Sequence, residues 1–150
     1  MKNVLTAALA CVATTGLAND GQFDAPMQAY LDTYILAWAS DPALVAAIAA
    51  QNRTTMDYDQ ATIDAMDKQW RGEVGTPYQP LVDTVTSNAA SDILRQRVEQ
   101  SGGAATEIFI MDARGLNVAA SAPTSDYWQG DEDKHIQTYL LGANSVHFGD

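Results

Sequence analysis

The chain has 150 residues, enough for one domain, and 47% of them are hydrophobic, so it can bury a core. Eight lysines and arginines against nineteen acidic residues give a formal net charge of -11. This charge excludes a nucleic-acid-binding protein, because too few bases are present to neutralise phosphates, and it argues against binding to an anionic membrane surface. The single cysteine, Cys11, excludes a disulfide framework and a cysteine-based zinc site.

The first eighteen residues are predicted to be a signal peptide. Lys2 supplies the positive start, residues 4–13 form a short apolar stretch, and Gly16-Leu17-Ala18 places small residues before a cleavage point after Ala18. The stretch is too short to span a bilayer, so we expect no membrane insertion after cleavage. An exported acidic chain without cysteine is typical of the bacterial periplasm, which is the expected location of a single domain over residues 19–150.

Helices are predicted from Asp24 to about Gly102. The first carries one apolar stripe, which we interpret as core or as a dimer seam and which consists of Met27, Tyr30, Leu31, Tyr34, Ile35 and Trp38. Ser40-Asp41-Pro42 ends this helix and starts an alanine-rich one that continues to about Gln51. A third helix is predicted from Asp59 to Arg71, with Asp67 and Arg71 as a surface ion pair. After a connector over residues 72–80, the helical pattern continues from Leu81 to Val98.

The hydrophobic period changes after Gly103. Residues 108–111 form the apolar run of a strand, Asp112-Ala113-Arg114-Gly115 provides a turn, and residues 116–120 form the returning strand. A helix is expected from Asp131 to Leu141, and residues 145–148 are expected to begin a third strand. The predicted class is therefore α+β: a helical N-terminal half packed on an antiparallel sheet that is incomplete at its C-terminal end.

Two stretches, MDARGLNVAAS (residues 111–121) and TSDYWQGDE (residues 124–132), resemble the Cache superfamily of extracytoplasmic, PAS-like sensor domains, also called PDC sensor domains. DKQWR at residues 67–71 belongs to the same resemblance, which covers about residues 25–150. The resemblance implies a long N-terminal helix on an antiparallel PAS-like sheet, with a small-molecule pocket between the sheet and the segment after the second strand. The sequence stops where the family's third strand starts, so we expect the later strands, part of the pocket wall and any transmembrane exit helix to be missing.

Asp126, Tyr127 and Trp128 are the first candidate ligand-binding residues. Two aromatic side chains beside a carboxylate suit an amine, a quaternary ammonium group or a polar metabolite. Alternatively, Asp126 caps the next helix and the two aromatic side chains fill the core. Asn117 could offer its amide to a ligand or satisfy a neighbouring backbone group, and Arg114 could grip a carboxylate or remain solvated.

No metal or catalytic site is predicted. Asp131 and His135 are one helical turn apart and His147 follows, but no His-Glu-x-x-His run accompanies them, and a helix-start acid beside a surface histidine explains the same residues. A calcium loop counted from Asp57 fails because Ala61 falls at a ligand position. A nucleophile elbow and a phosphate loop are both missing from the sequence.

The sequence therefore favours a periplasmic, non-enzymatic sensor domain for signal transduction that binds a small molecule, with no cofactor. The alternative is a structural or interaction module that completes its sheet with a partner chain or a second copy, as a homodimer. A third hypothesis is a metal-dependent hydrolase built on Asp131, His135 and His147. The ligand and the signalling partner cannot be identified from the sequence.

Overall fold

The computed structural model describes residues 23–149. The predicted signal peptide lies outside these described residues. The fold is mixed, with helices through the N-terminal half and a small antiparallel sheet after them, which confirms the α+β class. The sheet of the described residues has two strands. The larger PAS-like sheet therefore stays a prediction.

The first predicted helix consists of three pieces: α1 (Asp24–Tyr30), the π-helical turn η1 (Leu31–Ile35) and α2 (Leu36–Ala39). None of their residues is fully buried. Within the stripe, Met27 and Tyr34 are exposed, the other four residues are partly buried, and Trp38 packs against the core cluster around Leu44. The interpretation of this stripe as core is therefore wrong for Met27 and Tyr34 and holds in part for Trp38.

Two longer helices follow, each with an aspartate at its N-cap. The α3 helix (Pro42–Thr55) begins where Asp41 accepts the N–H of Ala43 at 2.8 Å, and it runs one turn beyond the predicted end. In α4 (Gln60–Glu73), Asp59 accepts the N–H of Thr62 at 2.8 Å. Such caps satisfy N–H groups that have no partner inside the helix.

The helical pattern after the connector is divided between α5 (Pro80–Thr86) and α6 (Ala89–Gln100). The division falls at Asn88, whose side chain accepts the N–H of Ser91 at 2.9 Å and donates to the carbonyl of Val118 at 3.1 Å. Asn88 thus caps α6 and also ties the helical half to the sheet.

The sheet is a hairpin of β1 (Phe109–Met111) and β2 (Asn117–Ala120), paired antiparallel with Ile110 opposite Ala119. The register shifts between Ile110 and Met111, as in a β-bulge. The predicted hairpin and its turn are confirmed.

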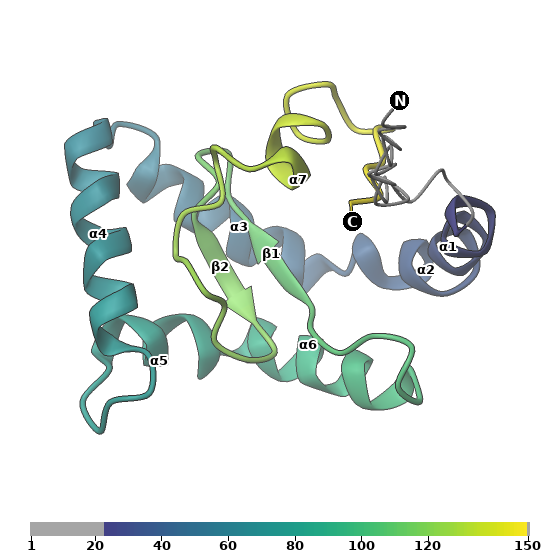
Figure 1. The fold of residues 1–150 in the computed structure, drawn as a ribbon, viewed down its shortest axis with the longest axis horizontal. Coiled ribbons are helices and arrows are strands. Elements are labelled where there is room, and N and C mark those ends of the chain that lie inside the picture. The colour runs from purple at the N-terminus through teal and green to yellow at the C-terminus, as the bar shows by residue number, and fades with distance from the viewer. Residues whose placement is uncertain (1–22, 150) are drawn as a thin grey trace, which may run out of the picture.

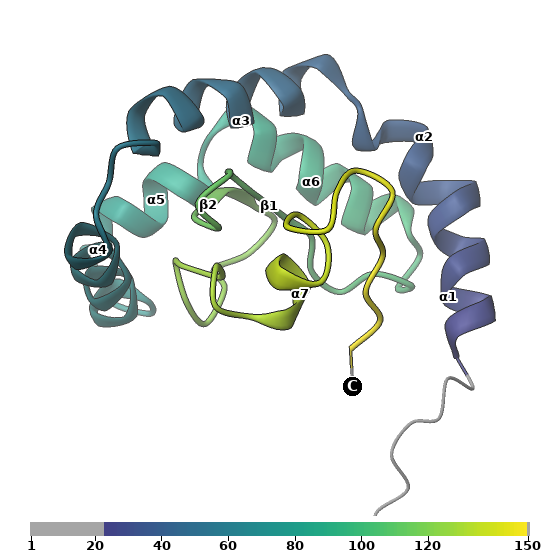
Figure 2. The same cartoon turned by 90° about the horizontal axis from the view of Figure 1, so that it is seen from above.

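Helices cover one face of this hairpin. Figures 1 and 2 show α3, α5 and α6 behind the strands, α7 (Asp133–Ile136) in front of them, α4 at one end of the molecule and α1 at the other. Two buried clusters join these layers. One contains Ile63, Trp70, Val82, Val85, Leu116, Ala120 and Tyr127, and the other contains Leu44, Ala90, Leu94 and Ala119.

Two predictions near the end of the chain are wrong. The helix expected from Asp131 to Leu141 is only the single turn of α7, and residues 145–148 form no strand. Leu140 and Leu141 are 62% and 68% exposed, so nothing packs against a longer helix to stabilise it. Residues 145–148 do not join the two-stranded sheet of the described residues.

Candidate functional site

The hairpin turn is organised by the buried carboxylate of Asp112. One oxygen accepts the N–H groups of Arg114 at 2.8 Å and Leu116 at 3.0 Å. The other accepts the Thr55 hydroxyl at 2.7 Å and the Gln51 amide at 3.0 Å. This network fixes the turn against α3 and sets the position of Arg114.

The segment after β2 folds back along the hairpin. Asn117 N–H donates to the carbonyl of Tyr127 at 3.0 Å, and Gln129 N–H donates to the carbonyl of Gly115 at 2.8 Å. Leu116 and Trp128 form an antiparallel bridge. These bonds place residues 126–129 beside the start of β2, at the edge away from β1.

Asp67 of α4 holds this segment from the other side. It is only 6% exposed, and one of its oxygens accepts the N–H groups of Tyr127 at 3.0 Å and Trp128 at 3.2 Å. Its second oxygen pairs with Arg71, which also donates to Asp126 at 3.0 Å. The interpretation of Asp67 and Arg71 as a simple surface ion pair is therefore wrong, because a surface pair would not reach the backbone of a distant segment.

The three consecutive candidates face different surroundings. Asp126 binds Arg71 and does not cap α7, whose N-cap residue is Glu132. Tyr127 is buried and stacks on Trp70 with ring centroids 5.6 Å apart. The pKa of the Tyr127 phenol is raised above its ordinary value, chiefly by burial and then by the charges of Asp112 and Tyr58.

Trp128 is partly buried, and its indole N–H donates to the carbonyl of Arg114 at 2.8 Å. Asn117 is fully buried and donates to the Thr124 hydroxyl at 2.8 Å and to the carbonyl of Asp126 at 2.9 Å. The Asn117 amide thus stabilises the segment after β2, while Arg114 contributes its backbone carbonyl and is itself partly buried.

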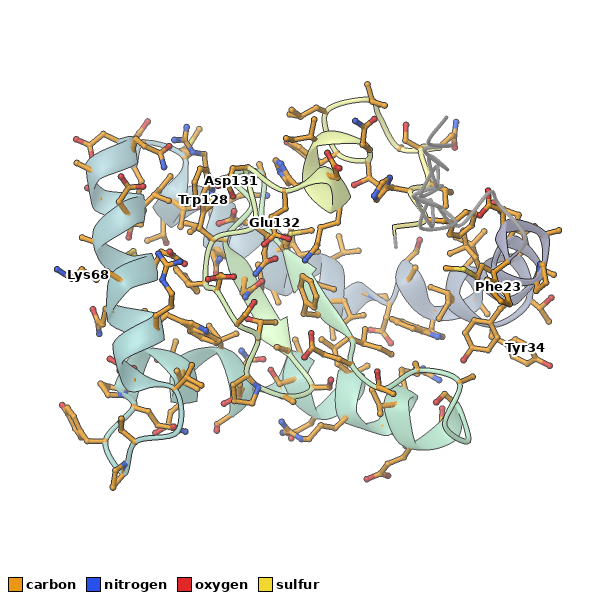
Figure 3. All side chains as sticks on the ribbon, in the orientation of Figure 1. Phe23, Tyr34, Lys68, Trp128, Asp131 and Glu132 are labelled. Carbon is orange, nitrogen blue, oxygen red and sulfur yellow. The ribbon has the colours of Figure 1, made fainter. Side chains whose placement is uncertain are left out.

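Asp126 and Trp128 line a cleft of about 330 Å³ between α4 and the segment before α7. We call it the acidic cleft, and its lining consists of Asp64, Asp67, Arg71, Asp126, Trp128, Asp131 and Glu132. Figure 3 shows Trp128, Asp131 and Glu132 close together beside α4. Five carboxylates face one arginine here, and Glu132 also pairs with Lys134 at 2.7 Å, so the cleft keeps a negative charge.

Tyr127 lines a different, largely apolar cavity of about 630 Å³ on the helical face, together with Tyr58, Met66 and Val118. The five candidate residues are therefore neighbours in space, joined by backbone and side-chain hydrogen bonds, yet they do not surround a single cavity. Asp64, Asp131 and Glu132 line the acidic cleft but were not among the residues predicted to bind a ligand. The acidic run at residues 131–133 is the sequence feature that could have indicated an acidic cleft, but such a run is equally typical of the start of a helix.

No group of three or more histidine, cysteine or carboxylate side chains within residues 23–149 could hold a metal ion. His135 is buried and stacks on Tyr139 with centroids 5.2 Å apart, so it is not the surface histidine that the spacing indicated. Asp131 and His147 line a shallow surface hollow without His135.

Comparison with models of known protein families, with curated proteins and with solved structures finds no match for this chain. In the described part of the chain, no single helix is long and apolar enough to cross a membrane. Asp24–Ala39 and Pro42–Thr55 are long and apolar enough for a membrane span only when they are taken together, and the two stretches meet at a bend of 74°.

Proposed function

We propose that the chain is a periplasmic, non-enzymatic sensor domain of the Cache type, and that it binds an organic cation in the acidic cleft. One observation carries the proposal. The stretch TSDYWQGDE, which resembles the Cache family, supplies four of the seven cleft residues, namely Asp126, Trp128, Asp131 and Glu132. More than half of the residues that line the acidic cleft thus come from the stretch that resembles the Cache family.

The chemistry of the cleft favours a cation. Arg71 is already paired with Asp67 and Asp126, so it offers little to an anion, while Asp64 and Asp131 are exposed carboxylates on the rim. The indole of Trp128 is held in place by its bond to Arg114. A fixed indole face beside carboxylates attracts ammonium groups through the ring quadrupole and through charge.

A thermal-shift titration with tetramethylammonium and putrescine tests the proposal. A compound at 100 times its dissociation constant adds about 2.7 kcal/mol of stability, which raises the melting temperature by about 5–10 °C. The double variant Asp64→Asn/Asp131→Asn removes two exposed charges and should weaken binding about tenfold.

Asp24→Asn/Asp32→Asn is the matched control, because it removes the same charge from exposed positions on α1 and η1 and should leave the affinity unchanged. Equal affinities in both double variants would rule out recognition by the acidic cleft. Trp128→Ala should abolish binding while the far-UV circular dichroism spectrum remains that of the parent.

One observation favours a second function, the completion of the sheet by another chain. Ile108 and Asp112 direct backbone groups towards β2. By alternation the backbone groups of Phe109 and Met111 point away from β2, to the edge of β1 that no other strand of the described residues occupies. An added strand could pair with them there. Sedimentation equilibrium of residues 19–150 tests pairing with a second copy. A mass that rises towards the dimer with concentration supports it, and a constant monomer mass contradicts it.

A further inference from the structure

A second pocket lies between the N-terminal helices and the end of α6. Its volume is about 550 Å³, within the range of small-molecule sites, and we call it the aromatic pocket. Its lining includes Tyr30, Thr33, Tyr34, Trp38, Arg97 and Ile108. Figure 3 shows Tyr34 far from Trp128 along the longest axis of the molecule, so this pocket is separate from the acidic cleft.

The π turn η1 contributes directly to this pocket. Thr33, Tyr34 and Ile35 belong to it, and the rings of Tyr30 and Tyr34 are tilted by 37° to each other with centroids 5.1 Å apart. Single π turns inside α-helices are rare, cost regular hydrogen bonds and occur frequently at functional sites. Here the turn places Thr33 and Tyr34 on the pocket wall, together with Tyr30 and Trp38 of the predicted apolar stripe.

Arg97 is the charged group of the pocket. Its guanidinium lies over the Trp38 ring, with Cζ 5.7 Å from the ring centroid. One terminal nitrogen donates to the Gln100 side chain at 3.0 Å, and Nε is buried without a hydrogen-bond partner in the described residues. Because Nε is inaccessible, a ligand in the pocket can contact only the terminal nitrogens of the guanidinium.

Arg97 has no carboxylate partner among the described residues. The ion pairs within residues 23–149 use Arg71, Arg95 and Lys134, and none of them involves Arg97. Arg53, Lys68 and Arg114 also form no ion pair there, and what distinguishes Arg97 is its place in the pocket beside Trp38. The pocket thus presents a guanidinium that is stacked on an indole and has donor capacity left for an external anion.

We propose that the aromatic pocket binds a small organic carboxylate with an aromatic or other apolar body. The carboxylate pairs with Arg97, whose planar fork matches its two oxygens, and the body packs against Tyr34 and Trp38. A single arginine in a chain of net charge -11 favours a monoanion over a doubly charged phosphate.

Isothermal titration of residues 19–150 with phenylacetate tests this proposal, with acetate and phenylacetamide as matched probes. We expect phenylacetate to bind at least about tenfold more tightly than either, because acetate lacks the body and phenylacetamide lacks the charge. Equal binding of phenylacetamide, or no binding of phenylacetate, would overturn the proposal.

Arg97→Met should weaken phenylacetate binding about tenfold or more, since a charged hydrogen bond is lost. Arg53→Met is the control, because Arg53 is also a base in the last turn of a helix, but it is exposed on α3. If Arg97→Met does not fold, Tyr34→Ala replaces it, since Tyr34 is 60% exposed. Unchanged affinity in the variant that folds would overturn the assignment.

Discussion

Gly115 is the position where a single residue most constrains the candidate site. Its φ of +79° lies in the left-handed region, and a Cβ there would be 2.5 Å from the Cα of Gly130. The glycine therefore allows both the hairpin turn and the close approach of the segment that carries Trp128.

Gly115→Ala is expected to cost about 3 kcal/mol or more of unfolding free energy. The left-handed backbone accounts for about 1–2 kcal/mol, and the clash with the Gly130 backbone adds to it. Gly75→Ala is the control, because Gly75 has a φ of +77° but a Cβ added there would meet nothing within 4 Å. Urea denaturation measures the unfolding free energy of both variants. Equal losses of unfolding free energy would show that the close approach of Gly115 to Gly130 does not matter.

The sequence predicted which residues around Trp128 would be neighbours, but not what each one does. The i,i+4 spacing of Asp67 and Arg71 indicated their pairing correctly. The burial of Asp67 depends on Tyr127, which is 60 residues away along the chain, and helix spacing carries no information about that contact. The same limit explains why the sequence does not show that Tyr127 and Trp128, adjacent along the chain, line separate cavities.

At the scale of elements, the junction of α4 and α5 depends on Glu73. Its carboxylate accepts the N–H groups of Leu81 at 2.7 Å and Val82 at 3.1 Å, in the first turn of α5. Burial acts to raise the pKa of Glu73, but the bonds from Gln69, Val82 and Leu81 outweigh it and hold this pKa below 4.5. The carboxylate thus caps α5 from another helix.

This lowered pKa predicts an acid-dependent loss of stability. The contribution of Glu73 is fully present above the ordinary pKa of 4.5 and is lost as the pH falls through the lower pKa of the folded state. Glu73→Gln should therefore melt at a lower temperature than the parent at pH 7, and the difference should shrink as the pH falls below the ordinary pKa of 4.5. Glu99→Gln, exposed on α6, is the control. A difference independent of pH would contradict the capping role.

Elements with strong local signals were predicted well. The helices that begin at Asp41 and Asp59 have caps, and the hairpin has a glycine at the required position of its turn. The π turn and the short α7 were not predicted, because apolar periodicity alone does not show whether a helix has a surface to pack against. The exposed Leu140 and Leu141 illustrate this for α7.

At the scale of the whole molecule, two pockets of opposite chemistry lie apart on one domain. The acidic cleft has a net negative lining beside Trp128, whereas the aromatic pocket has Arg97 beside Trp38. The third tryptophan, Trp70, is fully buried and donates to the carbonyl of Thr124 at 2.9 Å. The three tryptophans therefore have different surroundings, so their indole N–H resonances can be followed separately by NMR.

The most direct test of cation binding is a ¹⁵N–¹H NMR titration of these indole resonances with tetramethylammonium and putrescine, assigned through single Trp→Phe variants. Cation binding in the acidic cleft should produce a saturable shift of the Trp128 resonance, little change at Trp70, and no change at Trp38. A Trp128 resonance that stays fixed while either cation is raised to saturating concentration would contradict binding in this cleft.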